Sequence, residues 1–433
     1  MRVSRVVSGY RTVRAEMPRG WREPSRALGA NARFREELGL DPARPIVMAG
    51  HQAEAWHAGI LAKRLALGGV GPGARAAWIV VDQDANESAG RVRYPGVDAR
   101  GVVVAREWVF GPARAGVPTG MAPAAREIPA CPTDGATEDI ARGLARLGES
   151  LAAHAGSATL AMQVAGAVES LVPRDKGACT LVSATRIGGT ALFAEVVARM
   201  ERDPDACIGA YNAAAVRHPG AEVRALEPGE LPLWRVEPGR ARGRAEESSA
   251  GRLVPRALLM TGLLRWAGCD VFVHGTGGEA YDRVTAEWLG EWLGVELAPA
   301  GMVTATCVPT RDGRGVVTER EAAEAAARAT RARHDPAIVG DEDAARAKGA
   351  MVEEIARVKG AGGDPAGVFA RMQAMLEEYR ERRAEEIGAL DRAAARAAAA
   401  VKSAAVWEDR TWSWVLLGEE TVDELHAAVA GAI

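Results

Sequence analysis

The feature that most constrains the fold is a pattern that occurs three times along the chain. A short apolar segment ends in a loop of glycine, histidine and carboxylate residues, and a helix-compatible segment follows; the apolar segments are residues 45–49, 77–81 and 270–273. In a doubly wound sheet such loops gather at the carboxyl ends of parallel strands, where free backbone amides and helix N-termini favour anionic ligands. The pattern therefore predicts an α/β fold, a Rossmann-like doubly wound parallel sheet, with one site shared by the three loops.

The sequence predicts a core and a helical arm. A length of 433 residues exceeds what one ordinary core accommodates. Residues 1–318 should form the α/β core, because β-like and helical segments alternate from residue 45 to about residue 309 and the preceding residues should pack on them. Around residues 225–256, a high content of Pro, Gly and Arg indicates either a long loop or a small inserted subdomain, whose arginines either hold a phosphate or are solvated. Further strands are predicted at 102–104, 178–182 and 303–308, and helices at 25–38 and 190–202.

After about residue 318 the composition shifts to Ala, Glu and Arg, which favours long helices. Residues 360–363 interrupt the pattern, and Asp364-Pro365 supplies an N-cap and a first-turn proline for a new helix. The apolar residues from Phe369 to Val401 follow a heptad repeat with one four-residue stutter, and residues 351–358 carry a matching stripe. We therefore predict an antiparallel helical (coiled-coil) arm over residues 319–405, after which the tryptophan-rich residues 406–433 return to the core.

The seam of this arm is rich in alanine and buries little area per turn. Its main apolar side chains are Leu376, Tyr379, Ile387 and Leu390. Because two helices alone cover only part of these side chains, the sequence predicts a homodimer through the arm.

Charge and cysteine content exclude several classes of protein. The 54 basic residues nearly balance the 57 acidic ones, for a net charge of −3, so there is no global field for nucleic acid or an anionic membrane. The five cysteines are scattered without a C-x-x-C pair, as is typical of a reducing compartment. With no signal peptide and no apolar run of membrane-spanning length, we expect a cytoplasmic protein that acts on a small molecule, with no nucleic-acid or membrane partner.

The first loop, Gly50-His51-Gln52 with Trp56 and His57, follows a fully apolar strand, and the end of such a strand should face a crevice. Either histidine could act as an acid or base, or donate to a phosphate, because imidazole titrates near neutral pH. The alternative is that one of them is a structural histidine.

The second loop carries Asp82, Asp84 and Glu87. Carboxylates this close raise one another's pKa, or else they hold a metal or an ammonium group, which makes them candidate anchors for a substrate amine. The alternative is a helix N-cap in a solvated turn. A metal is disfavoured because no His or Cys lies at ligand spacing nearby.

The third loop resembles the start of a dinucleotide-binding loop but lacks the third glycine of G-x-G-x-x-G. Its backbone amides suit a phosphate or a carboxylate. The absence of G-x-x-x-x-G-K-[ST] and of G-x-S-x-G argues against a P-loop ATPase and against the hydrolase elbow. The candidate binding residues here are His274, Gly275, Gly277, Gly278, Glu279 and Tyr281.

The order of these elements resembles the bacillithiol synthase family, cysteine-adding enzymes that act on a glucosaminyl-malate precursor. Residues 50–53 with Trp56 are similar to that family's Gly-Gln-Gln loop and its following aromatic, and residues 78–87 are similar to its strand ending in Asp-His-Asp-x-Asp-Glu. Arg256 precedes the third loop as an arginine segment precedes Gly-Pro-Gly-Glu and a tyrosine in the family, and Arg410 lies in an element similar to its Gln-Glu-Arg. The chain departs from the family pattern in having His51 for Gln, Gln83 for His, Ala58-Gly59 for Gly-Pro, and a glutamate after the glycines that is offset by one position.

The resemblance implies an amide-forming carbon–nitrogen ligase that joins a cysteine, or a similar amino acid, to an amino-sugar conjugate. Asp82 and Asp84 would hold or deprotonate the amine, His51 would contact the anionic partner, and the glycine loop would bind a phosphate or carboxylate. The sequence fixes no cofactor, and a nucleotide such as ATP or ADP is one candidate. Two alternatives stay open: a catalytically lapsed nucleotide- or small-molecule-binding protein of the same fold, and a dinucleotide-dependent oxidoreductase.

Overall fold

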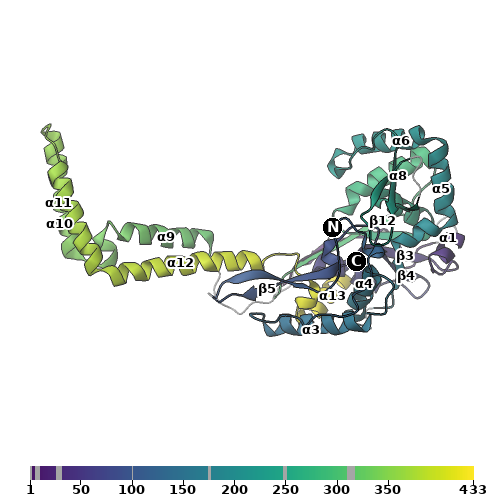
Figure 1. Cartoon of the computed structure of the whole chain (residues 1–433), viewed down its shortest axis with the longest axis horizontal. Coiled ribbons are helices and arrows are strands. Elements are labelled where there is room, and N and C mark those ends of the chain that lie inside the picture. Colours follow the sequence, from purple (N-terminus) through teal and green to yellow (C-terminus); the bar gives the residue numbers. More distant parts are fainter. Residues whose placement is uncertain are drawn as a thin grey trace. The chain divides into compact units, whose positions relative to one another are not determined.

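The computed structural model describes residues 2–4, 10–25, 32–99, 101–173, 177–246, 251–309 and 317–433 (Figure 1). The chain forms two compact units. The core unit comprises Met1–Gly96, Ala105–Thr310 and Asp409–Ile433, and the arm unit comprises Val97–Val104 and Arg311–Glu408.

A mostly parallel sheet organises the core unit. Its strands within the described residues are β1 (Arg2–Ser4), β2 (Tyr10–Glu16), β3 (Ile46–Gln52), β4 (Arg75–Val81), β7 (Thr180–Ser183), β11 (Val271–His274) and β12 (Ala300–Cys307). They lie in the order β1-β2-β12-β11-β3-β4-β7, in which β12, β11, β3, β4 and β7 run parallel, whereas β2 is antiparallel to both of its neighbours. The predicted α/β class is confirmed, as are the strands predicted at the three junctions and near residues 178–182 and 303–308.

The helices of the core unit are α1 (Ala32–Glu37), α2 (Ala58–Leu67), α3 (Glu138–Ala153), α4 (Leu160–Leu171), α5 (Ala191–Arg202), α6 (Pro204–Arg217), α7 (Ala257–Leu263), α8 (Gly278–Leu293) and α13 (Glu419–Ala432). They flank the sheet on both sides (Figure 1). Met48 of β3 joins an apolar cluster with side chains of α1, α5, α7 and α8. Its neighbour Val47, which points to the opposite face, is also fully buried. Burial on both faces requires continuously apolar strands, which is why the sequence reveals them.

Two smaller sheets complete the described strands. One contains β5 (Arg91–Val97) and β6 (Val103–Val109), so the strand predicted at 102–104 exists but lies outside the main sheet. The other is antiparallel and contains β8 (Glu230–Val236), β9 (Gly243–Glu246) and β10 (Arg252–Pro255), in the order β10-β8-β9. Residues 225–256 therefore contain this small sheet rather than one long loop, with 247–250 outside the described residues.

Both predicted helices of the core are present within the described residues. Thr190 caps α5 by accepting a hydrogen bond from the Phe193 amide at 3.3 Å, and this helix has the predicted extent. The described part of the helix predicted at 25–38 is α1 alone, because residues 26–31 lie outside the described residues. The chain leaves α1 through Gly39, whose φ of +78° favours glycine.

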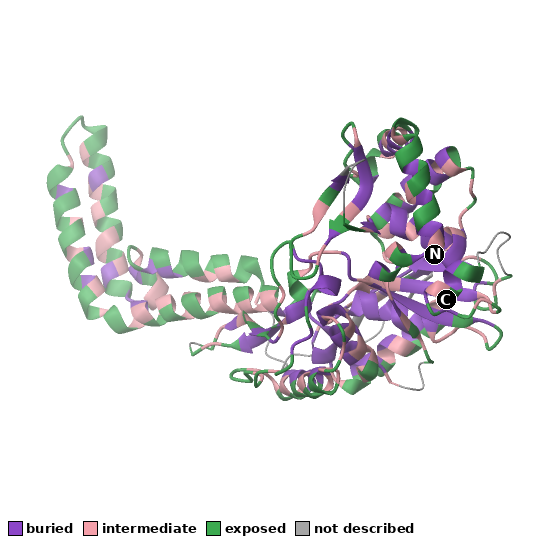
Figure 2. Cartoon of the chain, turned by 45° about the vertical axis from the view of Figure 1, so that its right-hand side comes forward, coloured by how far each residue is buried: buried purple, intermediate pink, exposed green. Residues whose placement is uncertain are grey.

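The arm unit contains α9 (Glu319–Ala332), α10 (Glu342–Gly360), α11 (Ala366–Arg382) and α12 (Ala384–Trp407), whose surfaces are mostly exposed or partly exposed (Figure 2). The helix α10 contacts α11, as predicted, but α12 contacts α9. The prediction of one continuous helix after Pro365 is wrong, because the backbone leaves the helical region at Arg383 (φ −108°). There Asp341 accepts hydrogen bonds from Arg382 and Arg383, both at 3.2 Å, which fixes the break.

The apolar side chains near this break are covered within a single chain. Leu376, Tyr379 and Ile387 are 2%, 0% and 7% exposed and pack with Ala344. The expectation that these residues need a partner chain is therefore wrong. In the described part of the arm unit, the large apolar side chains that are exposed are those of Val97, Val352 and Phe369.

Candidate functional site

The three predicted loops leave neighbouring strands at one edge of the sheet. Val273 of β11 pairs with Ala49 of β3, and His51 of β3 pairs with Val80 of β4. Since the three strands are parallel and adjacent, their carboxyl ends lie side by side, and we call this region the carboxyl edge. The prediction that the loops meet at one edge is confirmed by the strand pairing.

Two hydrogen bonds connect the loop after β3 to the loop after β4. The Gln52 side-chain amide donates to Asp84 at 3.0 Å, and the Asn86 amide donates to Glu54 at 3.1 Å. Both bonds involve partly buried groups, so the two loops form one polar surface.

His51 has one ring nitrogen occupied by the backbone. Its Nδ1 accepts a hydrogen bond from the Gln52 amide at 2.8 Å, and its Nε2 lies 3.6 Å from Glu54 Oε1. Burial, followed by the charges of Lys63 and His57, holds the pKa of His51 well below its ordinary value. The ring is therefore neutral, with its proton on Nε2, and it acts as a donor rather than as a base.

His57 has the same restriction. It caps α2, its Nδ1 accepts from the Gly59 amide at 3.0 Å, and burial, with Lys63 and Arg410, lowers its pKa to about 4. His57 is therefore a structural histidine that caps a helix, which was the alternative considered for one of the two histidines. Trp56 is fully buried beside Trp78, with ring centroids 4.6 Å apart, so it supports the loop from below.

Lys63, which the sequence pattern did not single out, lies next to the β3 loop. Its Nζ donates to the Gly50 carbonyl oxygen at 2.6 Å, and only 8% of the residue is exposed. Burial lowers the Lys63 pKa to about 8, an effect that the nearby Glu54 opposes. A single lysine within the wholly buried helix α2 is the signal that could have identified it.

Glu54 was also missed, although it faces both His51 and Asn86. Burial raises the pKa of its carboxyl group. The residue also lines a cavity of about 240 Å³, together with His57, Arg91, Arg93 and Ser413. Glu54 is thus a carboxyl group of raised proton affinity next to a space that a small molecule can enter.

Gly50 has a packing role. A Cβ atom at this position would lie 1.9 Å from Ile79 Cγ2 of the neighbouring strand, so only glycine fits. Packing alone therefore explains the glycine at this position, without a ligand at its backbone amide.

Asp82, which was expected to hold or deprotonate a substrate amine, is a buried carboxylate with internal partners. The residue is 1% exposed and accepts hydrogen bonds from the Ser183 hydroxyl at 2.5 Å, the Thr185 amide at 2.7 Å and the Thr185 hydroxyl at 3.0 Å. Burial raises its pKa, while these bonds oppose the shift. Asp82 therefore connects the ends of β4 and β7, and its geometry leaves little room for a ligand.

Asp84 is the more accessible of the two aspartates, with 22% of its side chain exposed. It forms an ion pair with Arg242, which also donates to the Gln83 carbonyl oxygen at 3.0 Å. The guanidinium groups of Arg242 and Arg256 each lie 4.2 Å from the ring centroid of Trp234. The small sheet thus places the Arg242 guanidinium at the carboxyl edge. This residue belongs to the arginine-rich stretch for which the sequence suggested either a phosphate site or a solvated loop.

Arg256 and Glu87 contribute less directly. Arg256 donates to Glu230 at 2.8 Å and to the Leu233 carbonyl oxygen at 3.0 Å, so it mainly stiffens the small sheet. Glu87 opens a short 3₁₀ helix (η1, Glu87–Gly90) and is an exposed partner of Arg91, at 3.5 Å. Arg410 enters the site through its charge, which lowers the pKa of His57.

The loop after β11 contains a histidine held by a carboxylate. His274 Nε2 lies 2.6 Å from Asp282 Oδ2, and Arg265 Nη1 lies 3.0 Å from Asp282 Oδ1. A Cβ atom at Gly278 would lie 2.6 Å from His274 Cγ, so this glycine allows the ring to pack against α8. Tyr281 is 45% exposed, and the side chain of Glu279 lies outside the described residues.

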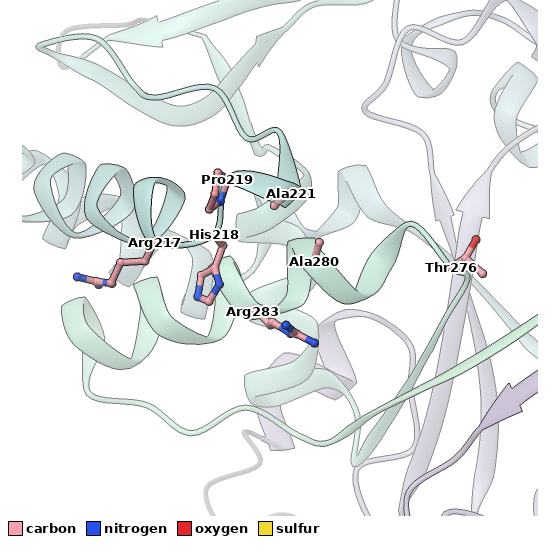
Figure 3. A pocket seen from close by; sticks show the side chains of 8 residues that line it. Arg217, His218, Pro219, Ala221, Thr276, Ala280 and Arg283 are labelled. Carbon is pink, nitrogen blue, oxygen red and sulfur yellow. The ribbon is translucent and has the colours of Figure 1, made fainter. Parts of the chain in front are cut away.

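A second cavity, of about 440 Å³, lies next to this loop (Figure 3). Thr276 lines it at one side, and Arg217 and His218 line it at the other. Both of the latter contact Glu287, at 2.5 Å in the case of His218, so these two side chains already have a partner within the protein. Gly275 and Gly277 flank Thr276, and no other atom would lie within 4 Å of a Cβ at either position, so a phosphate could approach the backbone of this loop.

Several absences hold for the described part of the chain. No group of three His, Cys, Asp or Glu side chains there could hold a metal ion. No described helix is long and apolar enough to cross a membrane. The five cysteines, all within described segments, are free thiols.

Comparison with known proteins adds no further constraint. No protein-family model matches the chain, and no curated protein matches it. The function is therefore inferred from the geometry of the carboxyl edge.

Proposed function

We propose that the carboxyl edge binds an amine and an acyl donor and joins them in an amide bond, as a carbon–nitrogen ligase similar to bacillithiol synthase. The proposed substrates are cysteine, or a similar amino acid, and an amino-sugar conjugate, with a nucleotide such as ATP as the activating cofactor. The observation that carries this proposal is the joining of the β3 and β4 loops by Gln52–Asp84 and Glu54–Asn86, which gathers acid, base and cation on one surface.

The charges on this surface suit an amino acid, which carries one group of each sign. Asp84 would hold an ammonium group, and Arg242 would hold a carboxylate, once a substrate separates this partly exposed ion pair. His51 would donate from Nε2 to an anionic oxygen. The backbone amides of Gly275 and Gly277 would contact a phosphate or carboxylate.

Glu54, rather than a histidine, is the proposed proton acceptor. In amide formation the amine nitrogen bonds to the activated acyl carbon, the leaving group departs with its bonding pair, and the surplus amine proton passes to a base. Glu54 has a raised pKa and lines a cavity, whereas both nearby histidines have Nδ1 occupied by a backbone amide. The catalytic role expected for Asp82 is not part of this proposal.

The test is a mass-spectrometric assay of purified protein with cysteine, glucosaminyl malate and ATP. A product whose mass equals the sum of the two substrates less one water is expected. Asp84→Asn should reduce its formation at least tenfold, whereas Glu87→Gln, a matched loss of charge on an exposed side chain three residues away, should not. Equal activity of wild type and Asp84→Asn would refute the assigned role.

A non-catalytic binding protein of the same fold is the second candidate. It is favoured by the engagement of Asp82 and of both histidine Nδ1 atoms in internal hydrogen bonds. Calorimetry distinguishes the two. Saturable heat with cysteine, the sugar conjugate or ATP, without product under any combination, supports the binding protein.

We further propose that the core is a Rossmann-like doubly wound domain, that the helices α9–α12 form a coiled-coil arm, and that this arm joins two chains in a cytoplasmic homodimer. The alternation of parallel strands and helices supports the first statement. In such a dimer, the exposed Val352 and Phe369 of the arm would be the apolar side chains that a second chain covers.

A further inference from the structure

A buried cation lies next to the two polar groups that the proposed reaction uses. Lys63 belongs to α2, a helix whose residues are all buried, and its ammonium group contacts the backbone at Gly50, directly before His51. We propose that Lys63 is a positioning residue, whose charge keeps His51 a neutral hydrogen-bond donor and favours the carboxylate form of Glu54, so that the two groups do not pair as imidazolium and carboxylate. This inference rests on the proposed function for the use of both groups in amide formation, but not for their charge states.

Burial and a short hydrogen bond fix the position of the ammonium group. Its Nζ donates to the Gly50 carbonyl oxygen at 2.6 Å and lies 5.5 Å from the centroid of the Trp78 ring. A buried ammonium group loses its hydration, and an unbranched apolar side chain would fill similar space without that cost. The bond to Gly50 does not require a charge, because a neutral amide could donate it. The charge is instead favoured by Glu54, which raises the Lys63 pKa against the effect of burial.

His51 and Glu54 are close enough to form an ion pair. The Nε2 atom of His51 lies 3.6 Å from Glu54 Oε1. A carboxylate at this distance favours protonation of an imidazole. The resulting imidazolium would neutralise the proposed proton acceptor. It would also place a proton on Nδ1, which accepts a hydrogen bond from the Gln52 amide at 2.8 Å.

The charge of Lys63 opposes this pairing on both sides. The pKa of His51 is lowered by burial first, and then by the charges of Lys63 and His57. Burial raises the pKa of Glu54, whereas the hydrogen bond from Asn86 and the charge of Lys63 lower it. A single cation thus disfavours the protonated form of both members of the pair.

The other charged groups at this edge do not replace Lys63. Asp84 is already paired with Arg242. His57, with a pKa of about 4, is neutral near pH 7, so Lys63 provides the positive charge that acts on His51.

The experiment is ¹H–¹⁵N NMR of the histidine imidazoles between about pH 5 and pH 8, which reports the charge and tautomer of each ring. The His51 signals are assigned by their loss in His51→Gln, and in the wild-type protein this ring should stay neutral with its proton on Nε2. Lys63→Met and Lys63→Gln both remove the charge, but only glutamine keeps a donor for the Gly50 carbonyl oxygen. In both variants His51 should take up a proton at a pH about one unit or more higher than in the wild type. His334, in the arm unit, should titrate identically in all of these proteins.

This measurement needs no substrate, so a protein that forms no ligation product still tests the role of Lys63. The proposal is overturned if His51 titrates alike in the wild type and both variants, or if its wild-type ring is an imidazolium at neutral pH. A shift in Lys63→Met alone also overturns it, because a neutral donor at Gly50 would then be sufficient. Circular dichroism verifies folding, and if the methionine variant does not fold, an unchanged His51 titration in Lys63→Gln decides against the proposal.

Discussion

Two aspartates that are two residues apart should differ sharply in what they contribute to folding. Asp82→Ala removes the acceptor of three hydrogen bonds and leaves the buried Thr185 amide without a partner. The unsatisfied amide alone costs about 1–3 kcal/mol, and the two hydroxyls add about 1 kcal/mol, since Ser183 and Thr185 still contact each other at 2.8 Å. The expected loss in the free energy of unfolding is about 2–4 kcal/mol.

Asp84→Ala is the matched control for stability. Its carboxylate is partly exposed, and ion pairs in such positions contribute about 0–1 kcal/mol. Urea unfolding followed by tryptophan fluorescence measures both variants, because every tryptophan except Trp407 belongs to the core unit. Equal unfolding midpoints for Asp82→Ala and wild type would refute the structural role of Asp82.

The pH dependence gives an independent check on the same carboxylate. The folded-state pKa of Asp82 is raised above its ordinary value of 3.8, so its ionisation costs folding free energy. Wild-type stability should therefore fall, relative to Asp82→Asn, as the pH rises from 3.8 through the folded pKa. A constant difference between the two proteins over this range would contradict the raised pKa.

The other predictions concern a lysine, a glycine and the arm. Lys63→Met should remove a pH dependence of stability. Because the folded-state pKa of Lys63 is lowered from 10.5 to about 8, the wild-type free energy of unfolding should increase, relative to that of the variant, as the pH rises from about 8 to 10.5. A constant difference between the two proteins in urea unfolding over this range would contradict the lowered pKa. Gly59→Ala places a Cβ atom 2.8 Å from His57 Cε1 and 2.9 Å from the Ala305 carbonyl oxygen, and should cost about 1–3 kcal/mol by urea unfolding. The control is Gly209→Ala within α6, where no atom lies within 4 Å and the change should be neutral or stabilising; equal effects would refute the packing argument. In the arm, Val352→Glu with Phe369→Glu should convert a dimer to monomers by light scattering without loss of helicity, whereas Leu376→Glu should reduce helicity, and a monomeric wild type would end the dimer proposal.

The parallel strands could be predicted from the sequence because their continuous apolar segments have a simple physical cause. Strands β3 and β4 are buried on both faces, so their residues are continuously apolar and stand out from the polar loops that follow. The meeting of the loops follows from the same reasoning, since adjacent parallel strands end at the same edge. Local sequence was sufficient for both predictions.

The roles of individual site residues depend on contacts between distant segments. Asp82 is buried because β7, about a hundred residues later, pairs with β4 and brings Ser183 and Thr185 to its carboxylate. Arg242 reaches Asp84 only because the small sheet forms. Composition and spacing carry no record of such pairings, so the sequence could not distinguish Asp82 from Asp84.

The arm shows the same limit for periodic patterns. The four-residue stutter of the heptad pattern falls at residue 383, but a stutter alone is compatible with one continuous helix. The break is fixed by the hydrogen bonds from Arg382 and Arg383 to Asp341, a residue about forty positions earlier that the pattern does not include. Hydrophobic periodicity therefore predicted the helices of the arm but not their ends or their pairing.

The residues of the carboxyl edge fall into two groups, buried residues that support the loops and partly exposed residues that a ligand can reach. Chemistry can occur only at the second group. Gly50, Lys63 and Asp82 are occupied by packing or by internal hydrogen bonds, so a substitution at any of them acts first on the fold. Glu54 and Asp84 lie above them on the loops and keep partly exposed carboxylates. A ligand that meets these two carboxylates and Arg242 needs no rearrangement of the strands beneath, because the supporting residues already hold both loops in place. Substitution of Glu54, Asp84 or Arg242 should therefore abolish chemical function at little cost in stability. Substitution of Gly50, Lys63 or Asp82 should instead reduce stability first.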